Sequence, residues 1–77
     1  GLAVHPASGE IYVLSGVRKA LVVLSPEGER VTAVSLPPGL YPQPEGIAFA
    51  ADGTLYIANE GGDGAATLLR LSPTPLP

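Results

Sequence analysis

The stretch GLAVHPASGEIYV at residues 1–13 returns as GIAFAADGTLYI at residues 46–57. The tyrosines of the two copies, Tyr12 and Tyr56, are 44 residues apart. A strand-rich repeat of about 40–50 residues is the size of one four-stranded propeller blade, and such a unit must stack on its neighbours to cover its apolar faces. The 77 residues hold fewer than two such units. We therefore expect the chain to be a piece of a larger body with a truncated start.

Strand signals fill both units of this repeat. In the first unit, glycine- and proline-containing turns separate short apolar or alternating segments, which predicts strands at residues 2–4, 10–15, 20–24 and 30–36. The second unit predicts strands at residues 46–49, 55–59 and 67–71. No segment shows helical periodicity with caps. The expected fold class is all-β, with antiparallel four-stranded blades that amount to about two blades of a β-propeller.

Proline content sets the expected boundaries of this organisation. Residues 1–36 form the first blade, and four prolines exclude a helix or a central strand from the inter-blade connection at residues 37–45. Residues 46–72 form a second, incomplete blade of three strands. Residues 73–77 are a proline-rich tail that cannot join a strand ladder.

Two local features of the blades can also be predicted. The continuous apolar run at residues 20–24 is typical of a strand buried on both faces. Asp52 and Gly53 are the residue types of a two-residue hairpin turn. A turn of that kind would fix the register of the two strands that it joins.

Composition excludes several classes of function. The net charge is −3 with only four basic residues, so the chain offers no basic stripe to a nucleic-acid backbone. No apolar run approaches the ~18 residues of a membrane span. The absence of cysteine excludes disulfides and thiolate chemistry. Two blades alone would leave apolar strands poorly covered, so we expect self-association or packing against the remaining blades of the same protein.

One stretch of the second unit resembles a known family. QPEGIAF at residues 43–49, followed by DGTLYIANE at residues 52–60, resembles the C-terminal end of the bacterial SdiA-regulated protein family, and the first unit is similar to the blade that precedes it. This implies a six-bladed propeller, similar to NHL-type propellers, gluconolactonases, calcium-dependent phosphotriesterases and esterase-like phytases. It also implies a central channel with a cation site and an exported, periplasmic or secreted, location. Asn59 departs from the serine that is commoner at its position, and the loop after Glu60 looks longer than the family's usual link.

Glu45 is the leading candidate for a site residue. It comes just before the strand that would line the channel, and the similarity to lactonase-like propellers implies that the glutamate before this glycine is a metal ligand. Glu60 and Asn59 end the antiparallel partner strand, so they return to the same end of the blade. A two-residue turn would place Glu60 opposite Glu45, whereas a slip of one residue would place Asn59 there. Facing carboxylates repel each other unless a cation or a shared proton lies between them, so this pairing points to a cation such as calcium. Two solvated side chains with no bound cation are the alternative.

Other polar residues give weaker signals. His5 stands before a proline and is typical of a turn residue, with a role as general base as the alternative. The serines lack the pattern of a nucleophile elbow. The stretch GGDG at residues 61–64 is typical of a surface loop, with an ion site that uses Asp63 as the alternative. Tyr41 lies in the proline-rich connection and is expected to be exposed.

Three functions stay open at this point. The first is a propeller of the SdiA-regulated type, with no established reaction, that binds calcium near Glu45. The second is a metal-dependent hydrolase of the lactonase, phosphotriesterase or phytase-like kind, in which other blades supply the missing ligands. The third is a platform for a protein or a small ligand, for which Tyr41 would be the exposed aromatic anchor.

Overall fold

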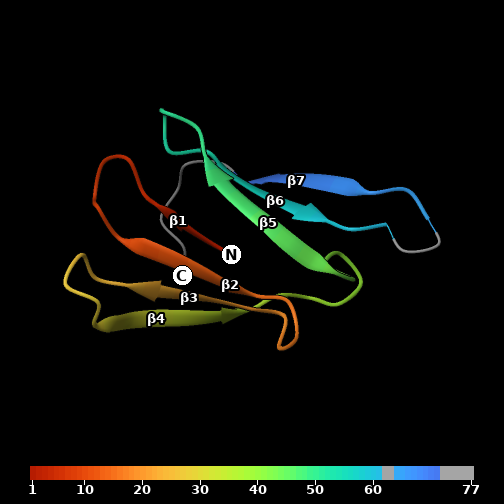
Figure 1. Ribbon diagram of the computed structural model, residues 1–77, viewed down its shortest axis with the longest axis horizontal. Coiled ribbons are helices and arrows are strands. Elements are labelled where there is room, and N and C mark those ends of the chain that lie inside the picture. The colour runs from red at the N-terminus through yellow and green to blue at the C-terminus, as the bar shows by residue number, and fades with distance from the viewer. Residues whose placement is uncertain (62–63, 72–77) are drawn as a thin grey trace.

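The computed structural model describes residues 1–61 and 64–71 of the chain. It shows two antiparallel sheets side by side (Figure 1). The first sheet contains, in spatial order, β1 (Leu2–Val4), β2 (Ile11–Ser15), β3 (Ala20–Leu24) and β4 (Arg30–Ser35). The second sheet contains β5 (Pro44–Phe49), β6 (Leu55–Asn59) and β7 (Thr67–Leu71). The predicted all-β class with antiparallel sheets is confirmed, and sheets of four and three strands are consistent with one complete and one incomplete propeller blade.

The strand bounds agree with the sequence prediction at most places. β1, β3, β6 and β7 begin and end at the predicted residues. β5 starts at Pro44, two residues before its predicted start at Gly46. A proline can occupy this position because it is the first residue of a strand at the edge of its sheet, where no ladder hydrogen bond requires its missing N–H. The predicted tail at residues 73–77 lies outside the described residues, as do residues 62 and 63 of the GGDG stretch.

The described part of the chain contains no helix. It therefore has no helix that is long and apolar enough to cross a membrane. All of its regular structure comes from hairpins between neighbouring strands. The β2–β3, β3–β4 and β5–β6 connections are short enough to hold consecutive strands together locally, as expected for an antiparallel meander.

The turn between β5 and β6 differs from the predicted two-residue turn. The Ala50 N–H donates to Thr54 O over 2.9 Å, so three residues, 51–53, form the loop. Gly53 has a φ of 90°, which is the left-handed conformation that closes three-residue hairpin loops. The Asp52 carboxylate accepts a hydrogen bond from the Thr54 N–H at 2.9 Å, and its hydrogen bonds with Thr54 hold the pKa of Asp52 below its ordinary value. The extra loop residue moves the strand register by one.

The hydrophobic core lies between the two sheets. Side chains alternate across each strand, and the core takes every second residue of β2, β3 and β6. The prediction that residues 20–24 are buried on both faces is wrong. Leu21 and Val23 on one face are buried, whereas Ala20, Val22 and Leu24 on the other face are only half-buried. The buried apolar residues of the core are Tyr12, Leu14, Leu21, Val23, Leu36, Tyr41, Leu55 and Ile57.

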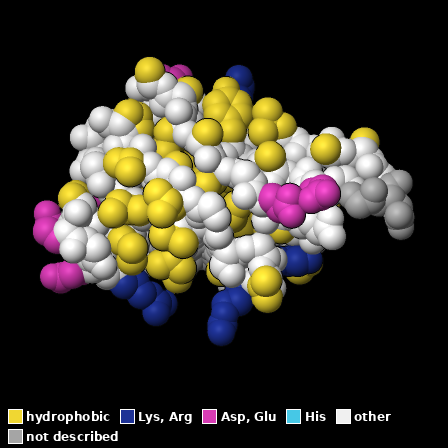
Figure 2. Space-filling view, in the orientation of Figure 1, with side chains coloured by type: hydrophobic (Ala, Val, Ile, Leu, Met, Phe, Trp, Pro, Cys, Tyr) yellow, Lys and Arg dark blue, Asp and Glu magenta, His cyan; other side chains and the backbone are white. Residues whose placement is uncertain are grey.

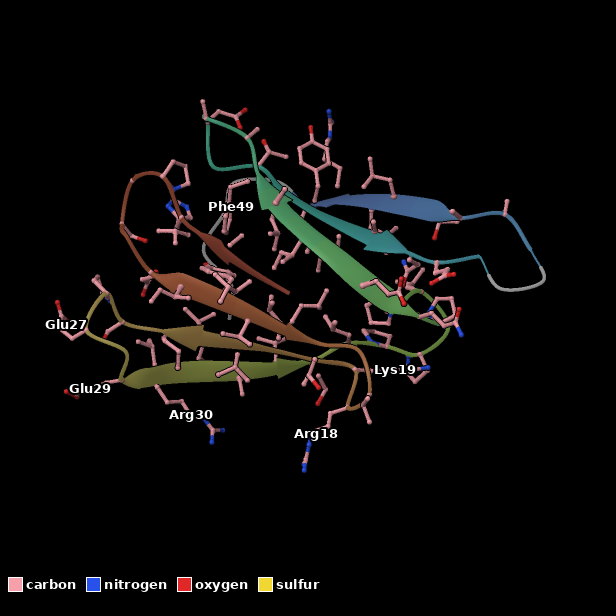
Figure 3. All side chains as sticks on the ribbon, in the orientation of Figure 1. Arg18, Lys19, Glu27, Glu29, Arg30 and Phe49 are labelled. Carbon is pink, nitrogen blue, oxygen red and sulfur yellow. The ribbon has the colours of Figure 1, made fainter. Side chains whose placement is uncertain are left out.

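Aromatic side chains join the sheets at one end of this core. Phe49 of the second sheet points toward the first sheet (Figure 3) and meets the Tyr12 ring edge-on, with 4.8 Å between the ring centroids. The His5 ring also meets the Phe49 ring edge-on, with 4.9 Å between their centroids. Tyr12 is thus an inter-sheet packing residue. Tyr56 occupies the equivalent strand position of the second sheet, where it is half-buried on the outer face.

Tyr41 was expected to be exposed, and this prediction is wrong. Its side chain is buried in the core together with Leu36, from the start of the same connection. The connection folds back through a turn in which the Tyr41 N–H donates to Pro37 O over 2.9 Å. The turn thus brings Tyr41 into the core. The interaction-platform reading therefore loses the exposed anchor on which it depended.

Candidate functional site

Glu45 occupies a β-bulge at the start of β5. Gly46 pairs with Ala58 and Pro44 pairs with Asn59, which leaves Glu45 as the additional residue between two ladder positions. Neither predicted register therefore applies, because Glu45 stands opposite neither Glu60 nor Asn59. The bulge lies between two registers of the same strand pair. The three-residue turn sets the register from Gly46 onward, and Pro44, at the end of the proline-rich connection, pairs in a register shifted by one residue.

The bulge brings the carboxyl groups of Glu45 and Glu60 together. The Glu60 N–H donates to Gln43 O over 2.9 Å, which fixes the backbone of Glu60 beside the entry of β5. Both glutamates are exposed, and Figure 2 shows acidic side chains side by side over this end of β5 and β6. A hydrogen bond between the two side chains, followed by their charge repulsion, raises the pKa of Glu45 above its ordinary value. The neutral form of the Glu45 carboxyl is therefore favoured over its ionised form more strongly than in an isolated glutamate.

Asn59 does not join this carboxyl pair. It lies on the core face of β6, like Leu55 and Ile57, and only 2% of it is exposed. Its Nδ2 donates to Leu40 O over 3.2 Å and to Thr67 Oγ1 over 3.3 Å. These bonds tie the proline-rich connection to β6 and β7. Asn59 Oδ1 is buried and has no hydrogen-bond partner among the described residues.

A shallow open pocket of about 230 Å³ lies beside Glu45. One wall is the turn between β2 and β3, and the other is the end of the proline-rich connection with the start of β5. The lining residues are Gly16, Val17, Pro42, Gln43, Pro44 and Glu45. Gly16 is a lining residue that was not predicted as part of this site. The sequence feature that could have identified Gly16 is a glycine in the turn between two strands, because glycine lets another backbone approach closely.

His5 lies at the other end of the first sheet and is held as a turn residue. Its Nδ1 accepts hydrogen bonds from the Ala7 N–H at 3.1 Å and the Ser8 N–H at 3.2 Å. This pattern requires the tautomer that carries its proton on Nε2. Because β1 runs from the Glu45 end of the blade to the His5 end, the imidazole and the carboxyl pair do not share a site. The turn interpretation of His5 agrees with these contacts.

The donor set for a cation is small. Among residues 1–61 and 64–71 no three His, Cys, Asp or Glu side chains come together as a metal cluster. Two adjacent carboxyl groups on an exposed surface can supply up to four oxygens to a hard cation, while water fills its remaining positions. The residues present therefore fit a loosely held calcium ion and do not fit a closed metal cage.

The raised pKa of Glu45 predicts a pH dependence that can be measured. Because the folded state raises the pKa of Glu45, its stabilising contribution is present below the ordinary glutamate value of about 4.3 and disappears as the pH rises through the raised pKa. Glu60→Gln removes the competing charge and should lower the pKa of Glu45 toward that ordinary value. An NMR titration of the Glu45 carboxyl carbon in both proteins measures the change.

The control for this titration is Glu27→Gln, which removes a carboxylate in the loop between β3 and β4, at the far end of the first sheet (Figure 3). It should leave the Glu45 titration unaltered. A Glu45 carboxyl that titrates at the same pH in wild type and Glu60→Gln would show that the two groups do not interact.

Comparison with known proteins places the chain in a family. The model of the SdiA-regulated family matches residues 1–62, which include the whole first sheet, β5, β6 and both glutamates of the pair. No curated protein matches the chain. The family match covers well over half of the sequence and ends between β6 and β7. The chain belongs to the SdiA-regulated family.

Proposed function

We propose that the chain is part of a β-propeller that binds a divalent cation, with calcium as the best match, between Glu45 and Glu60. The observation that carries this proposal is the place of two exposed carboxyl groups at the bulge, where the interaction with Glu60 raises the pKa of Glu45. The two carboxylates repel each other once both are ionised. A hard cation bound between them removes that repulsion.

The place of the pair in the fold also supports a binding role. β5 is the first strand of its sheet and lies against β1, the first strand of the preceding sheet. In a propeller the first strand of each blade lines the central channel, so the entry of β5 lies at a channel mouth. The pocket beside Glu45 gives a bound cation open access to solvent and to a small anionic ligand.

The expected affinity is low, because Glu45 and Glu60 supply only part of the six to eight oxygens that calcium takes. A dissociation constant of about 10⁻⁴–10⁻³ M is typical of sites with few protein ligands that are open to water. Because calcium binds the ionised carboxylate, binding should weaken as the pH falls through the raised pKa of Glu45.

Isothermal titration with calcium chloride at neutral pH tests the proposal. Wild-type protein should bind calcium, and Glu45→Gln or Glu60→Gln should each weaken binding by about tenfold or more. Glu27→Gln provides a matched control, because it removes the same charge from an exposed glutamate distant from the pair. Equal binding by all four proteins would assign the heat to non-specific charge, and absence of binding by wild type would remove the cation from the proposal.

A further inference from the structure

Two consecutive residues at the end of β6 hold the same stretch of the proline-rich connection. The Asn59 Nδ2 donates a hydrogen bond to Leu40 O over 3.2 Å, and the Glu60 N–H donates to Gln43 O over 2.9 Å. Both acceptors lie in the last part of the connection, just before β5 begins. The chain that leads into Glu45 is therefore held at two points, one by a buried side chain and one by a backbone amide.

The side-chain amide of Asn59 is fixed within the second sheet. Asn59 lies between Pro44 on β5 and Thr67 on β7 in the strand ladder. Pro44 is fully buried beside it, and Thr67 Oγ1 accepts the second hydrogen bond of Nδ2 at 3.3 Å. An asparagine amide has two N–H donors, and both are used here. The two bonds hold the amide in one orientation, with one N–H directed at the connection.

An asparagine at this position costs stability that an apolar residue would keep. The other core-facing residues of β6, Leu55 and Ile57, are apolar, whereas Asn59 Oδ1 is buried without a partner among the described residues. A buried acceptor that loses its water and gains no donor is unfavourable. Residues that depart from the best packing are expected where they serve a site. The contact that Asn59 gains in return is its bond to Leu40 O.

We propose that Asn59 is a positioning residue for the carboxyl pair. By anchoring the connection at Leu40 from the buried side, it fixes the entry of β5 and therefore the place of Glu45 relative to Glu60. Asn59 is not itself a ligand, because its side chain lies on the core face of β6. Its effect on calcium rests on the proposed function of the pair. Residues that orient metal ligands from behind in this way typically change metal affinity by about 10–100-fold.

Hydrogen exchange in the absence of calcium tests the anchor on its own. Asn59→Leu removes both N–H donors and keeps a side chain that branches at Cγ, on a face where apolar residues already pack. The Glu60 N–H, which binds Gln43 O, should then exchange about three- to tenfold faster relative to the Ile57 N–H in the middle of β6. A general loss of stability would accelerate both amides equally. Thr67→Val is the matched control, because it removes the other acceptor of Nδ2 and keeps the bond to Leu40 O.

Isothermal titration with calcium chloride measures the consequence for the site. Asn59→Leu should weaken binding by about tenfold or more, and Thr67→Val should bind like wild type. If wild type binds no calcium, the proposed function fails, while the exchange of the Glu60 N–H still decides the role of Asn59. An Asn59→Leu protein in which the Glu60 and Ile57 amides keep their wild-type ratio of exchange rates would overturn the proposal.

A measurement on wild type applies if Asn59→Leu does not fold. The Nδ2 protons of Asn59 should exchange much more slowly than the side-chain amide protons of Gln43, which is exposed. Equal exchange at the two side-chain amides would show that Asn59 does not hold the connection, and would overturn the proposal.

Discussion

Replacement of Leu21 by alanine should lower the free energy of unfolding by about 2–5 kcal/mol, the usual cost of removing most of a fully buried leucine side chain. Leu21 is 1% exposed and lies in the middle of the core. It pairs with Leu14 on one side and Val34 on the other, so three strands of the first sheet would border the cavity. A chain of 77 residues has a total stability of about 4–12 kcal/mol by ordinary scaling. The substitution should therefore remove a large part of it.

Urea unfolding followed by circular dichroism measures this loss, at a single protein concentration because self-association would also change the apparent stability. Leu40→Ala is the matched control. The Leu40 side chain is 59% exposed, and the carbonyl that accepts the Asn59 hydrogen bond is kept. The control should stay within about 0.5 kcal/mol of wild type. A Leu21→Ala protein equally close to wild type would mean that the core between the sheets does not hold the fold together.

The strands could be predicted because the repeat and the turn residues act locally. Alternation along β6 and the apolar run of β3 require only a pleated backbone between two turns, and both strands have the predicted bounds. Which faces are covered depends on other parts of the fold. The prediction for residues 20–24 failed because an apolar run indicates two faces that can be buried, while the described chain supplies a second sheet for only one of them.

Tyr41 shows a different limit of sequence reasoning. Four prolines exclude a strand through most of the connection, and this argument implied an exposed loop. The connection instead turns back on itself at Pro37, so that Leu36 and Tyr41 both enter the core. A proline-rich segment can be irregular and still buried when its apolar side chains cover the end of a sheet.

The sequence predicted that Glu45 and Glu60 lie at the same end of the second sheet, but it did not predict the register between them. The position of Glu45 and Glu60 at one end of a hairpin follows from antiparallel pairing alone, and the structure brings their carboxyl groups together. Their register depended on the number of residues in the Asp52–Gly53 turn and on the bulge, neither of which the residue types determine. Asn59 turns to the core because one residue along a strand reverses the face.

Gly16→Ala is expected to have the second-largest effect, and it tests how the sheets meet at the site. A Cβ on Gly16 would lie 2.6 Å from the carbonyl oxygen of Pro44, much closer than real contacts of this kind. The obstacle is a backbone atom, which cannot move aside like the end of a side chain. The β2–β3 turn and the start of β5 must therefore separate. We expect a loss of about 1–3 kcal/mol of stability, as is typical of overpacking.

The same displacement should disturb the carboxyl pair, because Pro44 and Glu45 are consecutive residues of β5. NMR should show shifts at Glu45 and Glu60 together with the loss of stability, and the raised pKa of Glu45 should move toward its ordinary value. Gly39→Ala supplies the control, since nothing lies within 4 Å of a Cβ at that position. It should be neutral or stabilise by about 0.4–1 kcal/mol, because alanine restricts the unfolded chain. If Gly16→Ala behaved like Gly39→Ala, the two sheets could not be as close at Pro44 as the structure has them, and the bulge at Glu45 would lose its support from the first sheet.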